Sequence, residues 1–556
     1  MDVRELTDDV SVAPQIALGD MAAIKAAGFA SIISNRPDGE QAGQPSFADI
    51  KAAAEAAGLQ AWHLPVVSGQ ITQADVAVFG AALSSMPGPV LAFCKSGTRA
   101  AILWTRSQAG QRPLAELLAR TNAAGYDLAA TVADMAETST RALAEPDIRS
   151  DIVIVGAGSA GIAVAASLLA RDGGLDITII DPADVHYYQP GWTMVGGGVF
   201  NAEQTKREMG PLIPDAVTWI KAAVAEFSPA SDAVILEDGR VVGYKRLIVC
   251  PGLELHWDGI AGLKDTLGRN GVTSNYRYDL APYTWKLVQG LNKGRAIFTQ
   301  PPMPIKCAGA PQKAMYLSGD AWFRRGVLKD IDIQFMNAGG ALFGVKEYVT
   351  ALMDYIAKYD ATLNFFHTLT AVDGAAKTAT FKVANPDTDP KEVTVDFDMI
   401  HVCPPQRAPA FIRNSALVDA AGWVDVDQAT LRHKTYTNIW SLGDVMNAPN
   451  AKTMAAARKQ APVVAVNVLA DIAGKSAAAI YDGYGSCPLT VERGKIVLAE
   501  FGYGGVLLPS FPNWLIDGTK PSRLAWALKA QGLPQVYWHA MLKGREWMAG
   551  PEKAPL

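Results

Sequence analysis

The stretch that decides the fold covers residues 151–161 and reads Asp-Ile-Val-Ile-Val-Gly-Ala-Gly-Ser-Ala-Gly. It joins a β-branched strand to an alanine-rich helix through a turn that contains Gly156, Gly158 and Gly161. Such glycines let the backbone approach a pyrophosphate, and the helix N-terminus favours its negative charge. Asp181 closes the next apolar strand, 20 residues after the last glycine, where its carboxylate can bind ribose hydroxyls. The pattern predicts an α/β fold with a dinucleotide site.

A second element, far along the chain, favours FAD over NAD at this site. Gly443-Asp444 follows the strand-like residues 439–442 and precedes a helix-prone stretch, residues 452–459. In flavoproteins with two dinucleotide-binding domains, such a Gly-Asp pair places its carboxylate on the flavin ribityl chain. The following helix then points its N-terminus at the flavin ring.

An insertion at about residues 293–372 repeats the alternation of strand and helix and should correspond to a nucleotide-binding domain. Its turn, residues 337–344, reads Asn-Ala-Gly-Gly-Ala-Leu-Phe-Gly and lacks a Gly-x-Gly-x-x-Gly pattern. No acidic or basic residue that could read a ribose stands out after the next strand, residues 363–366. We therefore expect an insertion that keeps the NAD-domain fold but is degenerate as a nicotinamide site.

Composition narrows the class of protein. The chain has 556 residues, a hydrophobic content of 49% and a net charge of -5 without a basic stretch, which argues against a nucleic-acid partner. Five cysteines without a Cys-x-x-Cys pair make a zinc site improbable and suit a reducing compartment. Residues 1–12 lack a signal-peptide pattern, and the apolar run 152–170 is explained as strand, turn and helix. The sequence predicts a cytoplasmic protein with no metal site, and leaves oligomerisation open.

Four segments are expected. Residues 1–112 alternate short strands and helices, residues 113–150 form a helical linker, and residues 151–500 form the dinucleotide-binding unit with its insertion. Residues 501–556 are rich in aromatic and basic side chains.

Two cysteines, Cys307 and Cys487, are candidates for redox chemistry. Cys307 lies among small and turn-forming residues with Lys306 beside it, and Cys487 lies just before a strand-like run. A cationic neighbour favours the thiolate, the reactive form of cysteine, and we expect Lys306 to fill this role. Two buried, inert thiols are the alternative interpretation.

Longer strings of residues resemble the sulfide:quinone oxidoreductases, in particular their mitochondrial-type branch. The resemblance covers residues 151–551 in order. Its most specific strings are Ser274-Asn275-Tyr276, residues 306–313 (KCAGAPQK), Phe343-Gly344-Val345-Lys346, His401-Val402-x-Pro404-Pro405, residues 421–427 and residues 481–489.

The resemblance implies a Rossmann-type flavoprotein of the disulfide-reductase kind, with FAD as cofactor and with Cys307 and Cys487 as its redox cysteines. It implies FAD contacts at Ser159, Ala160, Asp181, Gln189, Val224, Asp444, Lys452, Thr453, Met454 and Ala455. Cys250, Cys403 and His401 are expected to be structural core residues, because the family pattern has no cysteine at either thiol position.

The resemblance also implies the chemistry. Hydrogen sulfide would attack Cys487 of an oxidised pair, with or without an inserted sulfur, leaving a persulfide there and a thiolate at Cys307. Electrons would pass through the flavin to a membrane quinone. A low-molecular-weight thiol, sulfite or a second sulfide would remove the sulfane sulfur.

The C-terminal residues 501–556 fit a membrane-facing segment. Trp514, Trp526, Trp538 and Trp547 alternate with basic residues, as in segments whose aromatic rings lie at the headgroup level. We expect peripheral association with the inner (cytoplasmic) membrane, through which a quinone could enter. A helical cover packed on the flavin domain is the alternative, and both can hold at once.

In the N-terminal segment, Cys94 follows an apolar strand and precedes a helix, with Arg99 five residues later. A thiol at the mouth of such a loop, before a helix N-terminus, has a lowered pKa and can bind an oxyanion. The loop resembles that of phosphatase-like and rhodanese-like sulfurtransferase domains, although tyrosine-phosphatase loops place arginine six residues after cysteine. Sulfur transfer is favoured over phosphatase activity or an inactive domain.

Two other functions remain open at this point. One is an NAD(P)H-dependent flavin disulfide or persulfide reductase, which the poor glycine turn at Gly339 disfavours. The other is a protein phosphatase domain carried on a flavoprotein scaffold.

Overall fold

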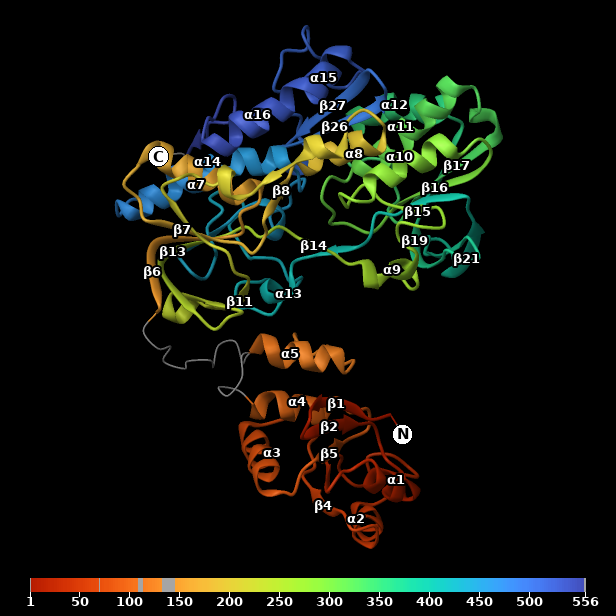
Figure 1. Ribbon diagram of the computed structural model, residues 1–556, viewed down its shortest axis with the longest axis vertical. Helices are drawn as coiled ribbons and strands as arrows, with labels where there is room; N and C mark the ends of the chain where they lie inside the picture. The colour runs from red at the N-terminus through yellow and green to blue at the C-terminus, as the bar shows by residue number, and fades with distance from the viewer. Residues whose placement is uncertain (1, 70, 109–113, 133–145, 555–556) are drawn as a thin grey trace. The chain divides into compact units, whose positions relative to one another are not determined.

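A parallel sheet built around β6 (Ile148–Val155) carries the glycine turn. In the computed structural model, which describes residues 2–69, 71–108, 114–132 and 146–554, β6 lies between β7 (Ile177–Ile180) and β13 (Val241–Val249) (Figure 1). β10 (Val217–Ile220) extends the sheet beyond β7, and β24 (Ile439–Ser441) pairs with β13, all in parallel. The parallel order places the carboxyl ends of β6, β13 and β24 at one edge of the sheet, so that Gly156 and Gly443 lie near each other in space although not in sequence.

Two helices cover this sheet at the edge where the glycine turn lies. α7 (Ser159–Arg171) begins four residues after β6 ends, and α14 (Met454–Ile472) packs against it. Both helices are rich in alanine and valine, which allows their backbones to approach closely. The apolar run 152–170 is thus a strand, a turn and a helix, as the glycines predict. Among the residues that the structure describes, no helix has the length and apolar character needed to cross a bilayer.

The insertion forms a second parallel sheet. Its strands, in order across the sheet, are β15 (Val272–Thr273), β22 (Met399–His401), β16 (Gly294–Gln300), β17 (Ile331–Asn337) and β18 (Ala361–Phe365). The sheet therefore extends beyond residues 293–372 on both sides. α10 (Ala281–Gly290), α11 (Ala310–Arg325) and α12 (Lys346–Lys358) accompany it, and β19 (His367–Asp373), β20 (Thr378–Val383) and β21 (Lys391–Asp396) form a separate antiparallel sheet.

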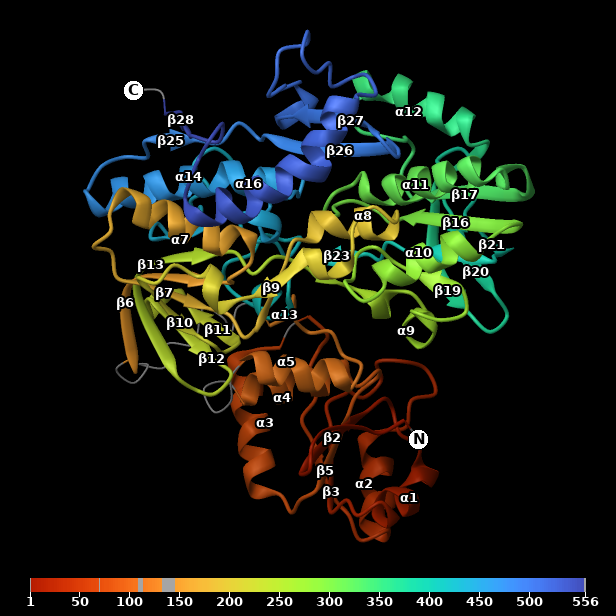
Figure 2. The same cartoon turned by 45° about the horizontal axis from the view of Figure 1, so that its top comes forward.

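The chain ends in a hairpin and a helical segment. β26 (Gly485–Glu492) and β27 (Lys495–Phe501) pair antiparallel, with β26 against α11 and β27 against α12 and α15 (Figure 2). α15 (Arg523–Ala527), a π-helical turn (Leu528–Gly532) and α16 (Leu533–His539) follow as one continuous helical path. The buried side chains of this path show that the tail is a cover, as the alternative interpretation held.

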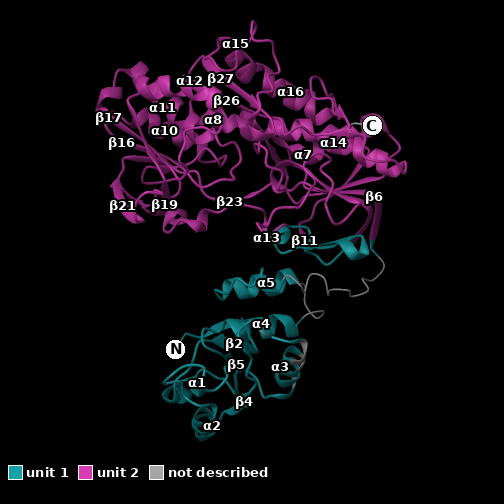
Figure 3. Ribbon diagram, turned by 180° about the vertical axis from the view of Figure 1, so that it is seen from behind, with its two compact units in different colours: residues 1–147, 225–241, 410–418 teal, residues 148–224, 242–409, 419–556 magenta. Residues whose placement is uncertain are grey.

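The N-terminal part of the chain belongs to a separate unit, which comprises residues 1–147, 225–241 and 410–418 (Figure 3). Its sheet has the order β1 (Arg4–Thr7), β2 (Val10–Ala13), β5 (Val90–Phe93), β3 (Ser31–Ser34), β4 (Gln60–His63), parallel except for β1. Alternate residues of the strands enter two cores, so that Ile33 and Ala92 pack on one face while Ile32 and Leu91 pack on the other.

Helices lie on both faces of this sheet. α3 (Gln73–Ser85), α4 (Thr98–Ser107) and α5 (Leu114–Ala123) supply the core that contains Ile33, and α1 (Met21–Ala26) and α2 (Phe47–Ala56) supply the other. α5 falls within the linker that the sequence predicts as helical, while residues 133–145 of that linker lie outside the described residues.

The remaining short elements are β8 (Val185–Tyr187), α8 (Trp192–Gly196), β9 (Lys206–Glu208), β11 (Val224–Ser228), β12 (Ala233–Leu236), β14 (Glu254–Leu255), α9 (Leu263–Thr266), β23 (Gln406–Arg407), α13 (Ala410–Arg413), β25 (Ala479–Ile480) and β28 (Glu552–Lys553).

Candidate active site

The glycine turn between β6 and α7 leaves room for a group at the N-terminus of α7. Gly156 has a φ of 103°, and a Cβ there would lie 2.7 Å from the Cys250 carbonyl oxygen. A Cβ on Gly161 would collide with the Gly156 carbonyl oxygen, whereas one on Gly158 would meet no atom within 4 Å. Asp181 accepts the backbone N–H of the residue that follows Gly156 at 2.7 Å, which fixes its carboxylate beside the turn. The open space thus lies where an anion would face the helix N-terminus.

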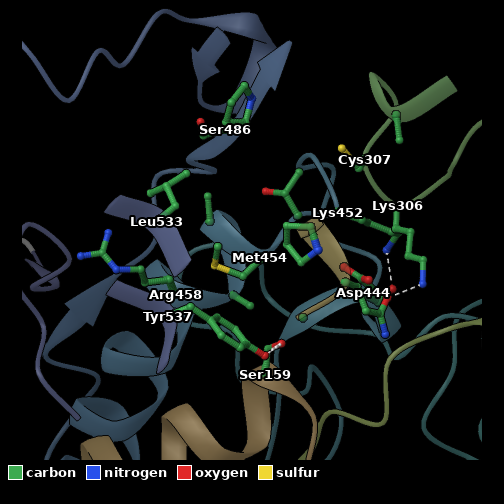
Figure 4. A pocket seen from close by; sticks show the side chains of 18 of the residues that line it. Ser159, Lys306, Cys307, Asp444, Lys452, Met454, Arg458, Ser486, Leu533 and Tyr537 are labelled. Atoms are coloured by element: carbon green, nitrogen blue, oxygen red, sulfur yellow. Dashed lines mark hydrogen bonds between the residues drawn. The ribbon is translucent and has the colours of Figure 1, made fainter. Parts of the chain in front are cut away.

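A cavity of about 310 Å³ extends from this turn (Figure 4). The residues of the predicted FAD site that line it are Gly158, Ser159, Ala160, Gln189, Asp444, Lys452, Thr453, Met454 and Ala455. Gly156, Gly161 and Asp181 shape the turn without lining the cavity, and Val224 is buried at the start of β11. Three distant segments of sequence therefore contribute to one cavity.

The N-terminus of α14 forms another wall of the cavity. Thr453 caps the helix by accepting the N–H of Ala456 at 3.2 Å. The Lys452 ammonium donates to the carbonyl oxygens of Asp444 (2.8 Å) and Met446 (2.7 Å), and burial lowers its pKa to about 8. Burial likewise raises the pKa of Asp444. These contacts hold the Gly-Asp loop against the helix that follows it.

Cys307 and Cys487, 180 residues apart in sequence, lie with their sulfur atoms 3.7 Å apart. Cys487 lies inside β26 rather than before a strand, so that this detail of the sequence prediction is wrong. Cys307 precedes α11 with a φ of 51°, a conformation that few residues other than glycine adopt. A Cβ on Gly309 would lie 2.5 Å from the Cys487 sulfur, so only glycine at this position permits the approach.

Lys313, not Lys306, contacts the Cys307 thiol. The Lys313 ammonium lies 3.0 Å from the Cys307 sulfur, in the first turn of α11, and is buried. Lys306 instead donates to Gln189 Oε1 at 2.6 Å, on the cavity side. The expectation that Lys306 holds the thiolate is thus wrong, because the two neighbours in sequence point apart. The lysine that does so, Lys313, follows Cys307 by six residues and lies in the first turn of α11.

The two sulfurs differ in their protonation. A hydrogen bond from the Cys487 thiol, together with the Lys313 ammonium, holds the pKa of Cys307 well below its usual range. The same hydrogen bond, burial and the charge of Cys307 raise the pKa of Cys487 well above its usual range. The reduced pair therefore consists of a Cys307 thiolate, which lines the cavity, and a Cys487 thiol behind it.

Lys529, which the sequence analysis left among the basic residues of the tail, lies inside the site. Its side chain is 4% exposed and donates to the Pro190 carbonyl oxygen at 3.3 Å. Burial and the charge of Lys313 lower its pKa to about 8, against the opposing attraction of the two cysteines. Lys529 lies on the π-helical turn, a feature often found at functional sites. The alternation of aromatic and basic residues in the tail does not distinguish this buried lysine from the exposed lysines of the same segment.

Tyr537 on α16 is a second residue that the sequence analysis missed. Its hydroxyl lies 2.7 Å from Ser159 Oγ and 2.5 Å from His186 Nε2. Burial lowers the pKa of His186 to about 4, so the ring is neutral and can share the hydroxyl proton. The tail thus closes over the glycine turn and positions a predicted FAD contact.

The other candidate residues of this unit are buried, and one of them, Cys250, also lines the cavity. Cys250 and Cys403 are buried, and burial raises the pKa of both thiols, that of Cys403 to about 12. His401 is fully buried and accepts the backbone N–H of Asn275 at 2.8 Å. Within the described ranges, no group of three or more His, Cys, Asp and Glu side chains is arranged to hold a metal ion.

The N-terminal unit brings Cys94 and Arg99 into one loop. Cys94 is 0% exposed, and its sulfur accepts the Gly97 N–H at 3.2 Å. Arg99 uses three of its five N–H donors on Glu40 Oε1 (2.8 Å), Glu40 Oε2 (2.9 Å) and the Val66 carbonyl oxygen (2.9 Å). The Arg99 guanidinium also interacts electrostatically with the Cys94 thiol.

Glu40 is the residue that holds this arginine, and sequence reasoning did not single it out. Hydrogen bonds from Arg99 and from Arg36, the latter at 2.7 Å, lower the pKa of Glu40 to about 2. Arg36 follows β3 and Cys94 follows β5, so the neighbouring parallel strands bring these groups to the same edge. The arrangement can bind an oxyanion between a guanidinium and a thiol.

Comparison with known proteins identifies the larger part of the chain. The mitochondrial sulfide:quinone oxidoreductase of Dictyostelium discoideum is 42% identical over 398 residues, which cover 71% of this chain and 86% of that protein. The chain belongs to the sulfide:quinone oxidoreductase family. Residues 150–284 match the pyridine nucleotide-disulphide oxidoreductase family, and membership implies a flavin cofactor.

A solved sulfide:quinone oxidoreductase, that of Aquifex aeolicus, has the same fold with a TM-score of 0.59 and 18% identity over 71% of this chain and 92% of that chain. Residues 2–111 match the phosphatase-like domain of beta-lactamase hydrolase-like protein. The protein of that name from Agrobacterium fabrum is 38% identical over 134 residues, which cover 23% of this chain and 31% of that protein. This sulfide:quinone oxidoreductase family member thus carries a phosphatase-like N-terminal domain.

Proposed function

We propose that this protein oxidises hydrogen sulfide at the Cys307–Cys487 pair with FAD and passes the electrons to a quinone. The observation that carries the proposal is the contact of the two sulfurs at 3.7 Å, with one of them at a cavity built from the glycine turn. A redox pair needs two sulfurs within bonding reach and one stabilised thiolate, and the pair meets both needs.

The residues around the cavity fit FAD. Gly158 leaves open space at the N-terminus of α7 for a pyrophosphate, and Asp181 is held beside it for the ribose. Both amide atoms of Asn275 and the Trp192 indole N–H line the cavity, are buried and have no partner within the described chain. Such groups suit the polar edge of a ring system. A bound flavin would accept two electrons from the cysteine pair and release them to the acceptor.

The cysteines would act in a defined order. Hydrosulfide attacks the Cys487 sulfur of a Cys307–Cys487 disulfide, which forms a persulfide on Cys487 and releases Cys307 as a thiolate. In this step the sulfide sulfur is oxidised by two electrons and the disulfide is reduced. The Lys313 ammonium, 3.0 Å from the leaving sulfur, stabilises the charge that develops there. The Cys307 thiolate lines the cavity, where it could pass electrons to a bound flavin.

The persulfide would be cleared by a second nucleophile. A thiolate of low molecular weight, or sulfite, attacks the outer sulfur of the Cys487 persulfide. The S–S bond of the persulfide breaks, the acceptor carries the outer sulfur away, and Cys487 is left as a thiolate. Lys313 and Lys529, both buried beside the pair, provide the positive charge that would draw hydrosulfide and this anionic acceptor inward.

The hairpin β26–β27 separates this chemistry from an acceptor end of the cavity. Cys487 and Leu489 pack with Ala499 in one core, whereas Ser486 and Glu500, on the opposite face, line the cavity. Apolar side chains of the tail complete this end: Phe511, Leu528, Leu533 and Val536. An apolar pocket with few polar groups suits the ring of a quinone.

The C-terminal tail carries exposed apolar side chains that suit a membrane surface, and one of them, Trp547, also lines the cavity. Trp514 is 84% exposed and Trp547 is 64% exposed, and Val506, Leu507 and Leu515 are also exposed. We infer peripheral attachment to the cytoplasmic membrane through these residues, which would let a lipid-soluble quinone enter the cavity. Replacing Trp514 and Trp547 together by serine should release the protein from liposomes. Unchanged binding would contradict the inference, and replacing the exposed Phe323 outside the tail serves as control.

The N-terminal domain would receive sulfane sulfur on Cys94. The Arg99 guanidinium and the Gly97 N–H can hold a persulfide or an oxyanion such as thiosulfate beside the thiol. Fusion of this domain to a sulfide-oxidising unit supports sulfur transfer as its activity. We assign residues 1–112, together with α5, which packs into their core, to this domain, the rest of residues 113–150 to a linker, 151–500 to the oxidoreductase and 501–556 to the interfacial cover.

Reduction of a short-chain quinone by sulfide tests the main proposal. The purified protein should reduce the quinone when sulfide and sulfite are supplied, and should not do so with NADPH in place of sulfide. Turnover with NADPH but not with sulfide would overturn the proposal in favour of a pyridine-nucleotide reductase.

A further inference from the structure

Glu500 is a buried carboxylate at the acceptor end of the cavity that the proposed sulfide chemistry does not use. It is 5% exposed and lines the cavity on β27, among the apolar side chains Leu498, Phe511 and Leu533. A carboxylate in such surroundings is costly unless it is hydrogen-bonded. Buried at this place, the Glu500 carboxylate needs hydrogen-bond partners.

Two groups satisfy the Glu500 carboxylate. The Tyr484 hydroxyl donates to Oε1 at 2.6 Å, and the Ser510 backbone N–H donates to Oε2 at 3.1 Å. The Ser510 hydroxyl lies 3.1 Å from the Tyr484 hydroxyl. Tyr484 also lines the cavity, and burial and the Glu500 charge raise its pKa, so it keeps its proton. The three side chains form one hydrogen-bonded chain.

The strand does not need this carboxylate to stay in place. The Glu500 backbone is held by Tyr348 on α12, whose hydroxyl accepts the Glu500 N–H and donates to the Glu500 carbonyl oxygen, each at 3.0 Å. The strand register with β26 provides further backbone bonds. The side chain of Glu500 is thus free to serve a role in the cavity.

Three further elements carry charged or titratable groups near the pair or on the same cavity wall: α14, α12 and the π-helical turn with Lys529. Arg458 on α14 lines the cavity and lies near Tyr484, and the Lys459 ammonium lies 5.5 Å from the Tyr484 ring centroid. Arginine does not release its proton in proteins. Tyr348 faces the backbone of Glu500 rather than the cavity. Lys529 also lines the cavity, but its ammonium donates to the Pro190 carbonyl oxygen and interacts with Lys313 and the two cysteines. Among the other groups named here, Tyr484 and Glu500 combine a mobile proton with a place on the cavity wall.

We propose that Tyr484 and Glu500 deliver the protons that the quinone takes up when it is reduced, and that Ser510 connects them to water. This inference rests on the proposed function. A quinone gains two electrons and two protons to become a quinol, and the electrons arrive from the flavin. Each proton leaves the short hydrogen bond between Tyr484 and Glu500 for a quinone oxygen, and the pair regains it through the Ser510 hydroxyl.

The position of Ser510 supports this path. Ser510 is half-buried and lines the cavity next to Phe511. Because Ser510 is partly exposed whereas Tyr484 and Glu500 are buried, protons can reach the pair from water through the Ser510 hydroxyl.

The test measures reoxidation of the reduced flavin in the variants Glu500→Gln and Tyr484→Phe. Protein reduced anaerobically with sulfide is mixed with a short-chain quinone or with ferricyanide, which takes electrons without protons. Both variants should be reduced by sulfide as fast as wild type and reoxidised by ferricyanide as fast as wild type. Reoxidation by quinone should slow by about 10²-fold, the usual contribution of a proton donor. It should also fall as the pH rises, because protons must then come from bulk water, and Glu500→Asp should restore part of the rate.

Glu492→Gln is the matched control, since Glu492 is a buried carboxylate on the same hairpin that bonds Lys358 and Lys495 away from the cavity. This control should reoxidise normally with both oxidants. Normal quinone rates in Glu500→Gln and Tyr484→Phe at all pH values would overturn the inference, as would equal slowing with ferricyanide. Failure of the wild type to be reduced by sulfide or reoxidised by quinone would instead overturn the proposed function itself.

Discussion

Cys307 and Cys94 were both expected to be reactive thiols, yet their surroundings differ. Cys307 has a second sulfur 3.7 Å away and a buried ammonium 3.0 Å away, and it lines a cavity. Cys94 is fully buried and has an amide N–H and a guanidinium as partners, but no cysteine beside it among the described residues. Two sulfurs release two electrons when they form a disulfide and take up two when it breaks, whereas a single thiol in an anion-binding loop can carry a transferred group. We therefore assign electron transfer to the unit that contains Cys307 and sulfur transfer to the unit that contains Cys94.

The largest effect should come from Cys307→Ser. Serine keeps the shape of the side chain but cannot form the disulfide or the thiolate, so sulfide should no longer reduce the flavin while the flavin stays bound. Anaerobic spectra after addition of sulfide check this. Cys403→Ser, at a buried thiol with a raised pKa outside the pair, is the control and should be reduced normally. A normal rate in Cys307→Ser would contradict the assignment.

The reciprocal change, Cys94→Ser, should abolish sulfane transfer while leaving sulfide-dependent quinone reduction intact. The thiol is the only group of its loop that can hold a sulfane sulfur, whereas the flavin cavity lies in the other unit. Transfer of sulfane sulfur from thiosulfate to cyanide, measured beside quinone reduction, separates the two activities. Equal loss of both would show that the units do not act independently. Hydrolysis of aryl phosphates by the wild type would favour the phosphatase alternative.

Replacing Lys313 by methionine should raise the pKa of Cys307 and slow sulfide-dependent reduction at neutral pH. Once the pKa exceeds the pH, each further unit removes about tenfold of the thiolate, and the rate should then recover as the pH increases. The pH profile of flavin reduction measures this. Lys306→Met should instead lower the flavin content without shifting the profile, because Lys306 bonds Gln189 rather than the thiol. A shifted profile in Lys306→Met would reverse the assignment.

The smallest effect concerns the N-terminal unit. Glu40→Gln weakens the hold on Arg99 and should slow sulfane transfer about tenfold, the value of one charged hydrogen bond. Because the pKa of Glu40 lies at about 2, its carboxylate stays ionised at higher pH, and the ion pair is lost only as the pH falls through that value. Wild-type transfer should therefore show no step near pH 4. Glu55→Gln, on the exposed face of α2, is the control.

Local patterns predicted much of the fold. The apolar strands predicted before Cys94 and before Asp181 are both present, as β5 (Val90–Phe93) and β7 (Ile177–Ile180), because short apolar runs between turn residues have few other solutions. The glycine turn and the Gly-Asp loop also come together as predicted, since parallel strands end at one edge. The pairing of Cys307 with Cys487 was accessible only through the resemblance, because nothing in the spacing links residues 180 positions apart.

The remaining features depend on side-chain direction and long-range packing. Lys306 was preferred to Lys313 because adjacency in sequence was taken as adjacency in space, whereas the first turn of α11 brings the later lysine back to the thiol. Lys529 and Tyr537 enter the site through the packing of the tail, which has no local signature. Glu500 and Ala499 point to opposite faces of β27. The sequence shows this alternation but does not show that the face with Glu500 lines a cavity.

Anaerobic stopped-flow measurement of the flavin absorbance, with sulfide in one experiment and NADPH in another, tests the central claim most directly. The account predicts rapid bleaching by sulfide alone, reversed by a short-chain quinone, and no fast bleaching by NADPH. Bleaching by NADPH with no response to sulfide would contradict it.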